Sequence, residues 1–262
     1  MGTMGIQISS LCILLGHDVN GWSRSIGAQH EELVTRGVKL LKRKVESGFE
    51  LGKFSPFNAS LATLPHVITI ECLREDLGIQ RCVLEQLSPE IFDIGLLTYS
   101  SSYGASEIQP KAQPPHFFNP VYSVKLVEGP TSNSIMQGSL SELFYRLQGL
   151  GFTVIETCGN RGLVGNYLLF NEISAALKLV DIHYYNCSTI DIVTAELGRS
   201  TSLFDLIDLI GVEVTLAILQ NLKEHDDAIY LSPVFHKAIA QSILGRKNKT
   251  SIRSVLSDSL SS

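Results

Sequence analysis

The chain has 262 residues, of which 44% are hydrophobic and 18% are charged, and its formal net charge at pH 7 is -5. This length and composition suit one large or two modest domains with a buried core. The negative charge argues against a nucleic-acid partner, and no apolar run reaches the roughly 18 residues that a membrane span needs.

The cysteines form no recognisable framework. None of them stands in a Cys-x-x-Cys pair, so no zinc site or other metal site is predicted. An odd number without regular spacing indicates reduced thiols and a cytoplasmic location, and the first residues lack the basic segment that opens a signal peptide. The five are Cys12, Cys72, Cys82, Cys158 and Cys187.

The first stretch of the chain is predicted to be a helix. Apolar residues at positions 8, 11, 12 and 15 fit one helical face, and Gly16 is a typical helix stop. The helix opens on Gly2, Thr3, Met4 and Gly5. This is the back half of a G-x-G-x-x-G loop, in which bare N–H groups at a helix start bind a pyrophosphate. Two glycines alone are a weak signal.

A short strand is predicted over 19–22, and the residues after it bear on the choice of cofactor. In dinucleotide-binding folds this strand ends in an acidic residue that binds the adenosine ribose hydroxyls. Ser23 stands there, followed by Arg24. A guanidinium without the carboxylate favours the 2′-phosphate of NADP. The alternative is that Arg24 is a solvated loop residue and the cofactor is NAD.

Helices and strands then alternate to about residue 158. The predicted helices cover 31–46, 77–87 and 139–150, and the predicted strands cover 67–70, 94–98 and 152–155, with a loop over 47–65. In the helix over 31–46, Leu33, Val38, Leu41 and Val45 are expected to face inward. The alternation predicts an α/β domain with a Rossmann-type sheet.

From residue 162 the pattern becomes purely helical. Long apolar helical segments are predicted from about 163, over 189–197 and over 204–222. The predicted organisation is a dinucleotide-binding domain over 1–158, a helical substrate and dimerisation domain over 159–253, and a flexible serine-rich tail over 254–262.

One histidine and one glutamate stand twelve positions apart in an apolar stretch. Pro120 ends whatever precedes it, and 122–127 is predicted to be a strand that leads to Glu128. A strand, a turn and a returning strand would bring Glu128 beside His116. A carboxylate on one imidazole nitrogen fixes the tautomer and raises the basicity of the other nitrogen, which makes a general base. The alternative is a packed, hydrogen-bonded core histidine.

Motifs along nearly the whole chain resemble those of the 3-hydroxyacyl-CoA dehydrogenases. The similar segments are Gly2-Thr-Met-Gly5, Glu71-Cys-Leu-Arg-Glu75-Asp-Leu77, the serine run after Tyr99, His116-Phe-Phe-Asn-Pro120, Lys125-Leu-Val-Glu128 and Gly162-Leu-Val-Gly-Asn166. The resemblance implies hydride transfer between a 3-hydroxyacyl thioester and NAD or NADP, in a cleft between the two domains.

Roles for single residues follow from the same resemblance. His116 is implied as the base, Glu128 as its partner, and Ser101 and Asn166 as the groups that hold the substrate oxygen. The expected cofactor-binding residues are Gly2, Thr3, Met4, Gly5, Ser23, Arg24, Glu75 and Asn119. For Glu75, a carboxylate that simply starts a helix is an equally physical alternative. The expected partners are acyl-CoA or another acyl thioester and a second copy of the chain, with neither nucleic acid nor membrane.

Some positions depart from the family pattern. Tyr99 replaces an asparagine, Arg161 replaces a proline, and 199–203 replaces a loop that lines the acyl site. The family's first strand has no counterpart before Gly2, so we expect that the sequence starts late, which the coding sequence upstream of Met1 would test. Two alternatives stay open: a catalytically impaired nucleotide- or acyl-binding module, and a dehydrogenase of another 3-hydroxy acid or carrier-bound acyl group.

Overall fold

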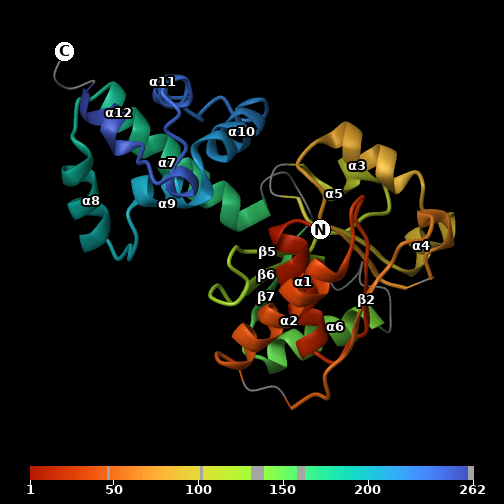
Figure 1. The fold of residues 1–262 in the computed structure, drawn as a ribbon. Coiled ribbons are helices and arrows are strands. Elements are labelled where there is room, and N and C mark those ends of the chain that lie inside the picture. The colour runs from red at the N-terminus through yellow and green to blue at the C-terminus, as the bar shows by residue number, and fades with distance from the viewer. Residues whose placement is uncertain (46–47, 66, 101–102, 131–138, 158–162, 259–262) are drawn as a thin grey trace. The chain divides into compact units, whose positions relative to one another are not determined.

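The computed structural model describes the chain except for residues 46–47, 66, 101–102, 131–138, 158–162 and 259–262. It divides into two compact units, Met1–Leu163 and Val164–Ser262. The first alternates helices and strands, and the described part of the second contains helices alone (Figure 1). This confirms a Rossmann-type unit followed by a helical one. The division falls after Leu163, slightly later than the predicted boundary at 158.

The first unit contains short strands and helices that alternate along the chain. Its helices are α1 (Thr3–Leu14), α2 (Ala28–Lys42), η1 (Leu61–Thr63), α3 (Leu77–Leu84), α4 (Pro89–Ile94), α5 (Ala105–Ile108) and α6 (Ser139–Gly149). Its strands are β1 (Val19–Gly21), β2 (Phe54–Pro56), β3 (Thr69–Glu71), β4 (Leu96–Thr98), β5 (His116–Phe117), β6 (Leu126–Pro130) and β7 (Thr153–Thr157).

The strands of the first unit belong to three separate sheets in the described residues. β1 pairs with β2 and β3 pairs with β4, both in parallel. In the third sheet, β6 lies between β5, which is antiparallel to it, and β7, which is parallel to it. The pair β1–β2 shows that the predicted loop over 47–65 was wrong in part, because Phe54–Pro56 is a strand in it.

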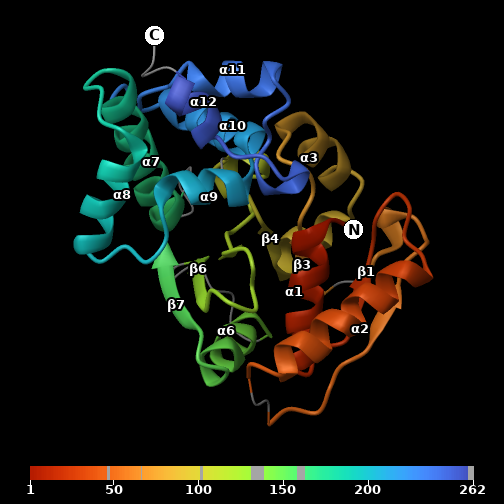
Figure 2. The same ribbon diagram turned by 60° about the vertical axis from the view of Figure 1, so that its left-hand side comes forward.

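Helix α1 forms as its apolar spacing predicts and is buried on two sides. Ile8, Leu11 and Leu15 pack into one cluster with β3 and β4 residues, whereas Ile13 packs into a second cluster beside α2. Gly16 ends the helix with φ of +88°, a conformation that glycine adopts at little cost. Both views show α1 and α2 side by side (Figures 1 and 2).

Helix α2 corrects one predicted core position. Leu33 is exposed and its neighbour Val34 is buried, together with Val38, Leu41 and Val45. The error is one residue, because spacings of three and four residues both fit a helical face of 3.6 residues per turn.

Strand β6 also differs from its predicted bounds. It begins at Leu126 rather than at Tyr122, since residues 121–123 form a turn.

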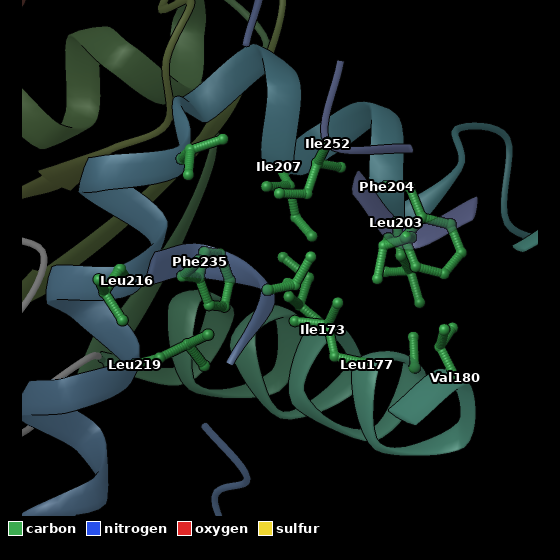
Figure 3. Packing of buried hydrophobic residues seen from close by; sticks show 14 of the residues in the cluster. Ile173, Leu177, Val180, Leu203, Phe204, Ile207, Leu216, Leu219, Phe235 and Ile252 are labelled. Carbon is green, nitrogen blue, oxygen red and sulfur yellow. The ribbon is translucent and has the colours of Figure 1, made fainter. Parts of the chain in front are cut away.

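The second unit is built around one apolar cluster. Its helices are α7 (Leu163–Asp181), α8 (Cys187–Glu196), α9 (Leu203–Ile210), α10 (Val212–Lys223), α11 (Val234–Ala240), η2 (Arg246–Asn248) and α12 (Arg253–Asp258). Ile173 and Leu177 of α7 meet Ile207 of α9, Leu219 of α10 and Phe235 of α11 at its centre (Figure 3).

Two predictions for this unit were wrong. The single helix predicted over 204–222 is two helices, because Gly211 has φ of +105° and breaks the run between α9 and α10. Residues 254–258 of the predicted flexible tail belong to α12. Val255 and Leu256 are fully buried in the main cluster, and their apolar contacts hold the helix in place.

Candidate active site

His116 and Glu128 meet across two antiparallel strands. β5 and β6 pair in a register that puts His116 directly opposite Glu128, and side chains opposite one another in such a pair lie on the same face. His116 Nδ1 lies 3.2 Å from Glu128 Oε2, and both side chains are buried. The proximity predicted from the sequence is therefore present, and a carboxylate beside Nδ1 fixes which tautomer the imidazole adopts.

Two aromatic rings enclose the imidazole. Tyr99 stacks on His116 with ring centroids 5.3 Å apart and an interplanar angle of 14°. Phe118 meets the same ring edge-on at 4.7 Å. Tyr99 follows β4 directly and packs its ring against the candidate base. The replacement of the family's asparagine by Tyr99 therefore lies beside the candidate site.

A large cavity in the first unit begins at the amino-terminal end of α1. Its volume is about 1620 Å³, and Gly2, Thr3, Met4 and Gly5 all line it. The first N–H groups of a helix have no acceptor within the helix. A Cβ added at Gly2 would meet no atom within 4 Å, so the backbone there is open to a ligand. Such a helix start suits an anionic pyrophosphate.

Ser23 and Arg24 line the same cavity. The Ser23 hydroxyl is buried and has no hydrogen-bond partner among the described residues. Buried polar groups are nearly always paired, so an orphaned hydroxyl on a cavity wall points to a ligand group. Arg24 is exposed. These two residues therefore fit the adenosine end of a dinucleotide.

Glu75 also lines the cavity, and its partner is a serine that sequence reasoning passed over. Ser100 Oγ donates to Glu75 Oε2 at 3.1 Å and accepts the N–H of Tyr103 at 2.9 Å. Ser100 is buried, and the serine run after the strand was the available signal for it. The predicted substrate contact, Ser101, lies outside the described residues.

Asn119 does not line the cavity, but it is tied to the helix that opens it. Gln7 of α1 donates from Nε2 to Asn119 Oδ1 at 3.1 Å, and its Oε1 accepts the N–H of Val121 at 2.7 Å. Gln7 therefore clamps the turn after His116 to α1. Nothing in the sequence pattern singled it out, since the two partners lie more than a hundred residues along the chain.

Glu71 is a second buried carboxylate of the first unit. It accepts hydrogen bonds from the Thr98 hydroxyl, from the N–H of Leu73 and from Gln80 Nε2, the last at 3.2 Å. Burial raises the pKa of this carboxyl, although the three donors favour its charged form. Glu71 therefore joins β3 to β4 and α3, which is a structural role.

Asn166 belongs to the second unit. It is buried in the first turn of α7. Arg161, one of the departures from the family pattern, lies outside the described residues, whereas Arg199 pairs with Glu172 of α7. In the described part of the chain, no helix is long and apolar enough to cross a bilayer, and no cluster of three His, Cys, Asp or Glu side chains suits a metal ion.

Both parts of the chain match known families. Residues 1–157 match a sequence model described as "3-hydroxyacyl-CoA dehydrogenase, NAD binding domain", and residues 162–254 match "3-hydroxyacyl-CoA dehydrogenase, C-terminal domain". The chain is similar to a 3-hydroxybutyryl-CoA dehydrogenase of Clostridioides difficile, with 29% identity over 95% of this chain and 94% of that one.

More distant likenesses agree. Human mitochondrial hydroxyacyl-coenzyme A dehydrogenase is 27% identical over 94% of this chain and 86% of its own. The solved structure of (S)-3-hydroxybutyryl-CoA dehydrogenase PaaH1 from Ralstonia eutropha has the same fold, with a TM-score of 0.74, 20% identity and coverage of 96% and 95% of the two chains. The NAD-binding domain model matches residues 1–157, and the C-terminal domain model matches residues 162–254. This protein therefore belongs to the 3-hydroxyacyl-CoA dehydrogenase family of NAD-dependent oxidoreductases.

Proposed function

We propose that this protein interconverts a 3-hydroxyacyl-CoA and the 3-ketoacyl-CoA by hydride transfer with NAD. The observation that carries the proposal is the buried pair of His116 and Glu128, 3.2 Å apart. Family membership supplies the reaction class, and the pair supplies the acid–base chemistry that the reaction needs.

The acid–base step follows from the two ring nitrogens. Nδ1–H of His116 donates to Glu128, which fixes the tautomer and leaves the Nε2 lone pair to take the proton of the 3-hydroxyl group. Glu128 then lies beside the imidazolium that forms and stabilises its charge. In the reverse direction His116 returns the proton to the keto oxygen. Ser101 and Asn166 are proposed to hold that oxygen by hydrogen bonds, which gain strength as negative charge develops on it.

The cofactor site is proposed in the cavity of the first unit. The nicotinamide, when bound, accepts the hydride that leaves the substrate carbon. The open helix start at Gly2–Gly5 would hold the pyrophosphate, and Ser23 and Arg24 would hold the adenosine ribose. Glu75 would hold the ribose next to the nicotinamide. Asn119, which Gln7 ties to α1, is proposed as a further cofactor-binding residue. Because Arg24 is a cation without a neighbouring carboxylate at position 23, we also propose that NADP is accepted.

Assembly and location extend the proposal. Leu168 of α7 and Ile192 of α8 are both more than 60% exposed, and Leu197 is 82% exposed. Exposed apolar side chains on α7, on α8 and just after α8 favour a homodimer through the helical unit. The four described cysteines are in the free thiol form, which is consistent with the cytoplasmic location that we propose.

The test is reduction of acetoacetyl-CoA, followed by the loss of absorbance of NADH and, separately, of NADPH. His116→Gln should lower kcat/KM by about 10²–10⁴-fold and leave the circular dichroism spectrum unchanged. His225→Gln is the matched control, because His225 is exposed in the second unit. Turnover that survives His116→Gln would refute the mechanism.

One observation favours a second candidate function. Tyr99 covers a face of the His116 ring where the family pattern has asparagine. A chain that binds NADH but turns over no acyl thioester would be a nucleotide-binding relative or a dehydrogenase of another 3-hydroxy acid. Isothermal titration with NADH beside the activity assay separates these outcomes, and Tyr99→Asn should restore turnover if the stacked ring is the obstacle.

A further inference from the structure

One glutamine of α1 holds the turn that follows His116. Gln7 Oε1 accepts the N–H of Val121 at 2.7 Å, and Gln7 Nε2 donates to Asn119 Oδ1 at 3.1 Å. Val121 is buried in the cluster that also contains Phe117 of β5, so the turn is anchored in the core of the first unit. Gln7 therefore connects the helix that opens the cavity to the segment that carries the proposed base.

A single backbone group decides which way round two side-chain amides lie. A backbone N–H can only donate a hydrogen bond, so the Gln7 atom that faces Val121 is the oxygen. The NH2 group of Gln7 then faces Asn119. Because an NH2 group can only donate, Asn119 presents its own oxygen to Gln7. Amide orientations are usually a matter of assignment, but here both follow from the N–H of Val121.

The consequence is a directed donor on Asn119. With Oδ1 bonded to Gln7, the Nδ2 amino group occupies the other branch of the amide and carries two N–H donors. The side chain belongs to an exposed residue, so a ligand can reach it. The chain therefore offers a hydrogen-bond donor, and not an acceptor, three residues after His116.

The group that this donor would meet is an oxygen of the cofactor. Tyr99 lines the cavity and also stacks on His116, so the reactive end of a dinucleotide in the cavity would lie beside the segment that holds His116 and Asn119. The carboxamide and the ribose at that end both carry acceptor oxygens. If the Asn119 amide were reversed, its oxygen would face those oxygens and the hydrogen bond would be lost.

We infer that Gln7 is a positioning residue for the cofactor. It fixes the Asn119 amide so that Nδ2 donates to an oxygen at the nicotinamide end of the bound dinucleotide. Gln7 does not line the cavity and acts through Asn119. The inference rests on the proposed cofactor role of Asn119, and it is tested by binding of NADH rather than by turnover.

Two variants of Gln7 separate positioning from structural support. At pH 8, Gln7→Glu keeps an oxygen for the N–H of Val121 but has no donor, so the Asn119 amide turns round and presents its oxygen to the cofactor. Gln7→Met has a similar length and makes neither bond, which leaves the Asn119 amide free to rotate. Gln7→Glu should raise the dissociation constant of NADH by about 5–10-fold, the effect of one lost hydrogen bond.

The Gln7→Met variant should behave differently in the two measurements. It should raise the dissociation constant by only about two- to threefold, since the freed amide can still donate at the cost of rotamer entropy. Its thermal unfolding midpoint should nevertheless be the lower of the two, because the N–H of Val121 loses its acceptor. A merely structural role would give the same order in both measurements.

A double variant shows through which residue Gln7 acts. Asn119→Ala removes the donor and should raise the dissociation constant of NADH by about 5–10-fold. In the Asn119→Ala chain, Gln7→Glu should cause no further change, because its effect requires the Asn119 amide. Gln148→Glu adds the same charge at an exposed position of α6 and should leave the constant unchanged.

The inference would be overturned if Gln7→Glu bound NADH as tightly as the parent protein, or if Gln7→Met weakened binding more than Gln7→Glu does. It would also be overturned if the effects of Gln7→Glu and Asn119→Ala multiplied in the double variant, because the added charge would then be the cause. A parent protein that binds NADH without reducing acetoacetyl-CoA would refute the proposed reaction alone, since these constants are measured without an acyl substrate.

Discussion

The two units bury their apolar residues in different ways. In the second unit, one cluster runs through α7, α9, α10, α11 and α12. In the described part of the first unit, the buried residues fall into three clusters and the strands into three sheets. A continuous core tends to open as one block, whereas separate clusters around a cavity can open locally. We therefore expect the first unit to be the less stable one.

The difference also separates the roles of the units. The first unit holds His116, Glu128 and the cavity, so the proposed base, its partner and the proposed cofactor site lie in the unit whose core is divided into separate clusters. Ligands stabilise whatever state they bind. Binding of the cofactor in the cavity should therefore stabilise the first unit and leave the second unchanged.

The largest expected effect comes from emptying the core of the second unit. Phe204 is fully buried there, and the Arg253 guanidinium lies 5.1 Å from its ring centroid. Phe204→Ala should lower the free energy of unfolding of this unit by about 3–5 kcal/mol. Phe117→Ala is the matched variant, because Phe117 is equally buried in the first unit.

Two optical probes distinguish the units. Trp22 is the one tryptophan of the chain and belongs to the first unit, so its fluorescence reports on that unit, whereas far-ultraviolet circular dichroism reports on both. In urea, Phe204→Ala should shift the dichroism transition and spare the fluorescence transition, and Phe117→Ala should shift the fluorescence transition. If Phe204→Ala shifted the fluorescence transition together with the dichroism transition, the two units would unfold as one cooperative block.

A smaller effect is expected from a buried carboxylate of the second unit. Asp208 Oδ1 accepts the N–H of Ile252 at 2.8 Å, in the interior where α9 meets the segment before α12. Asp208→Ala leaves that N–H without an acceptor and should cost about 1–3 kcal/mol in dichroism-monitored unfolding. Asp208→Asn keeps an oxygen in place, so a loss as large as that of Asp208→Ala would show that the charge, not the hydrogen bond, stabilises the unit.

A helix cap on the surface should matter less. Asn186 accepts the N–H of Thr189 at 2.8 Å and begins α8. Asn186→Ala should lower the stability of the second unit by about 1 kcal/mol. Asn186→Asp preserves the acceptor and serves as its control. A change in the Trp22 fluorescence transition with either variant would contradict the separation of the two units.

Local patterns explain which elements the sequence predicts well. His116 and Glu128 lie on adjacent strands of one connection, so alternation and a proline suffice to bring them together. Helix α1 and the glycine that ends it are likewise marked by residues that are close together in the sequence. The strand Phe54–Pro56 has three residues and pairs with a strand 35 positions earlier in the chain, so no local period marks it. The break at Gly211 is missed because apolar residues continue on both sides of it.

Contacts over long sequence distances explain what the sequence leaves out of the site. Gln7 acts through partners at positions 119 and 121, and Ser100 through Glu75. Neither residue type is distinctive, and only the folded chain brings the partners together. The stack of Tyr99 on His116 is of the same kind: the sequence marks Tyr99 as unusual, but its contact depends on β4 ending beside β5.

The smallest expected effect is a pH dependence confined to the first unit. Burial raises the pKa of Glu71 above its ordinary value of 4.5, so the folded state binds the proton more tightly than the unfolded state. The stabilisation that this proton provides is complete below about pH 4.5 and is lost as the pH rises through the raised pKa of the folded state. Glu71→Gln does not titrate. From pH 4 to pH 7, the Trp22 fluorescence midpoint of the parent protein should therefore fall relative to that of Glu71→Gln. A relative midpoint that rises with pH would mean that the hydrogen bonds from Thr98, Leu73 and Gln80 outweigh burial and that Glu71 is charged in the folded state throughout this range.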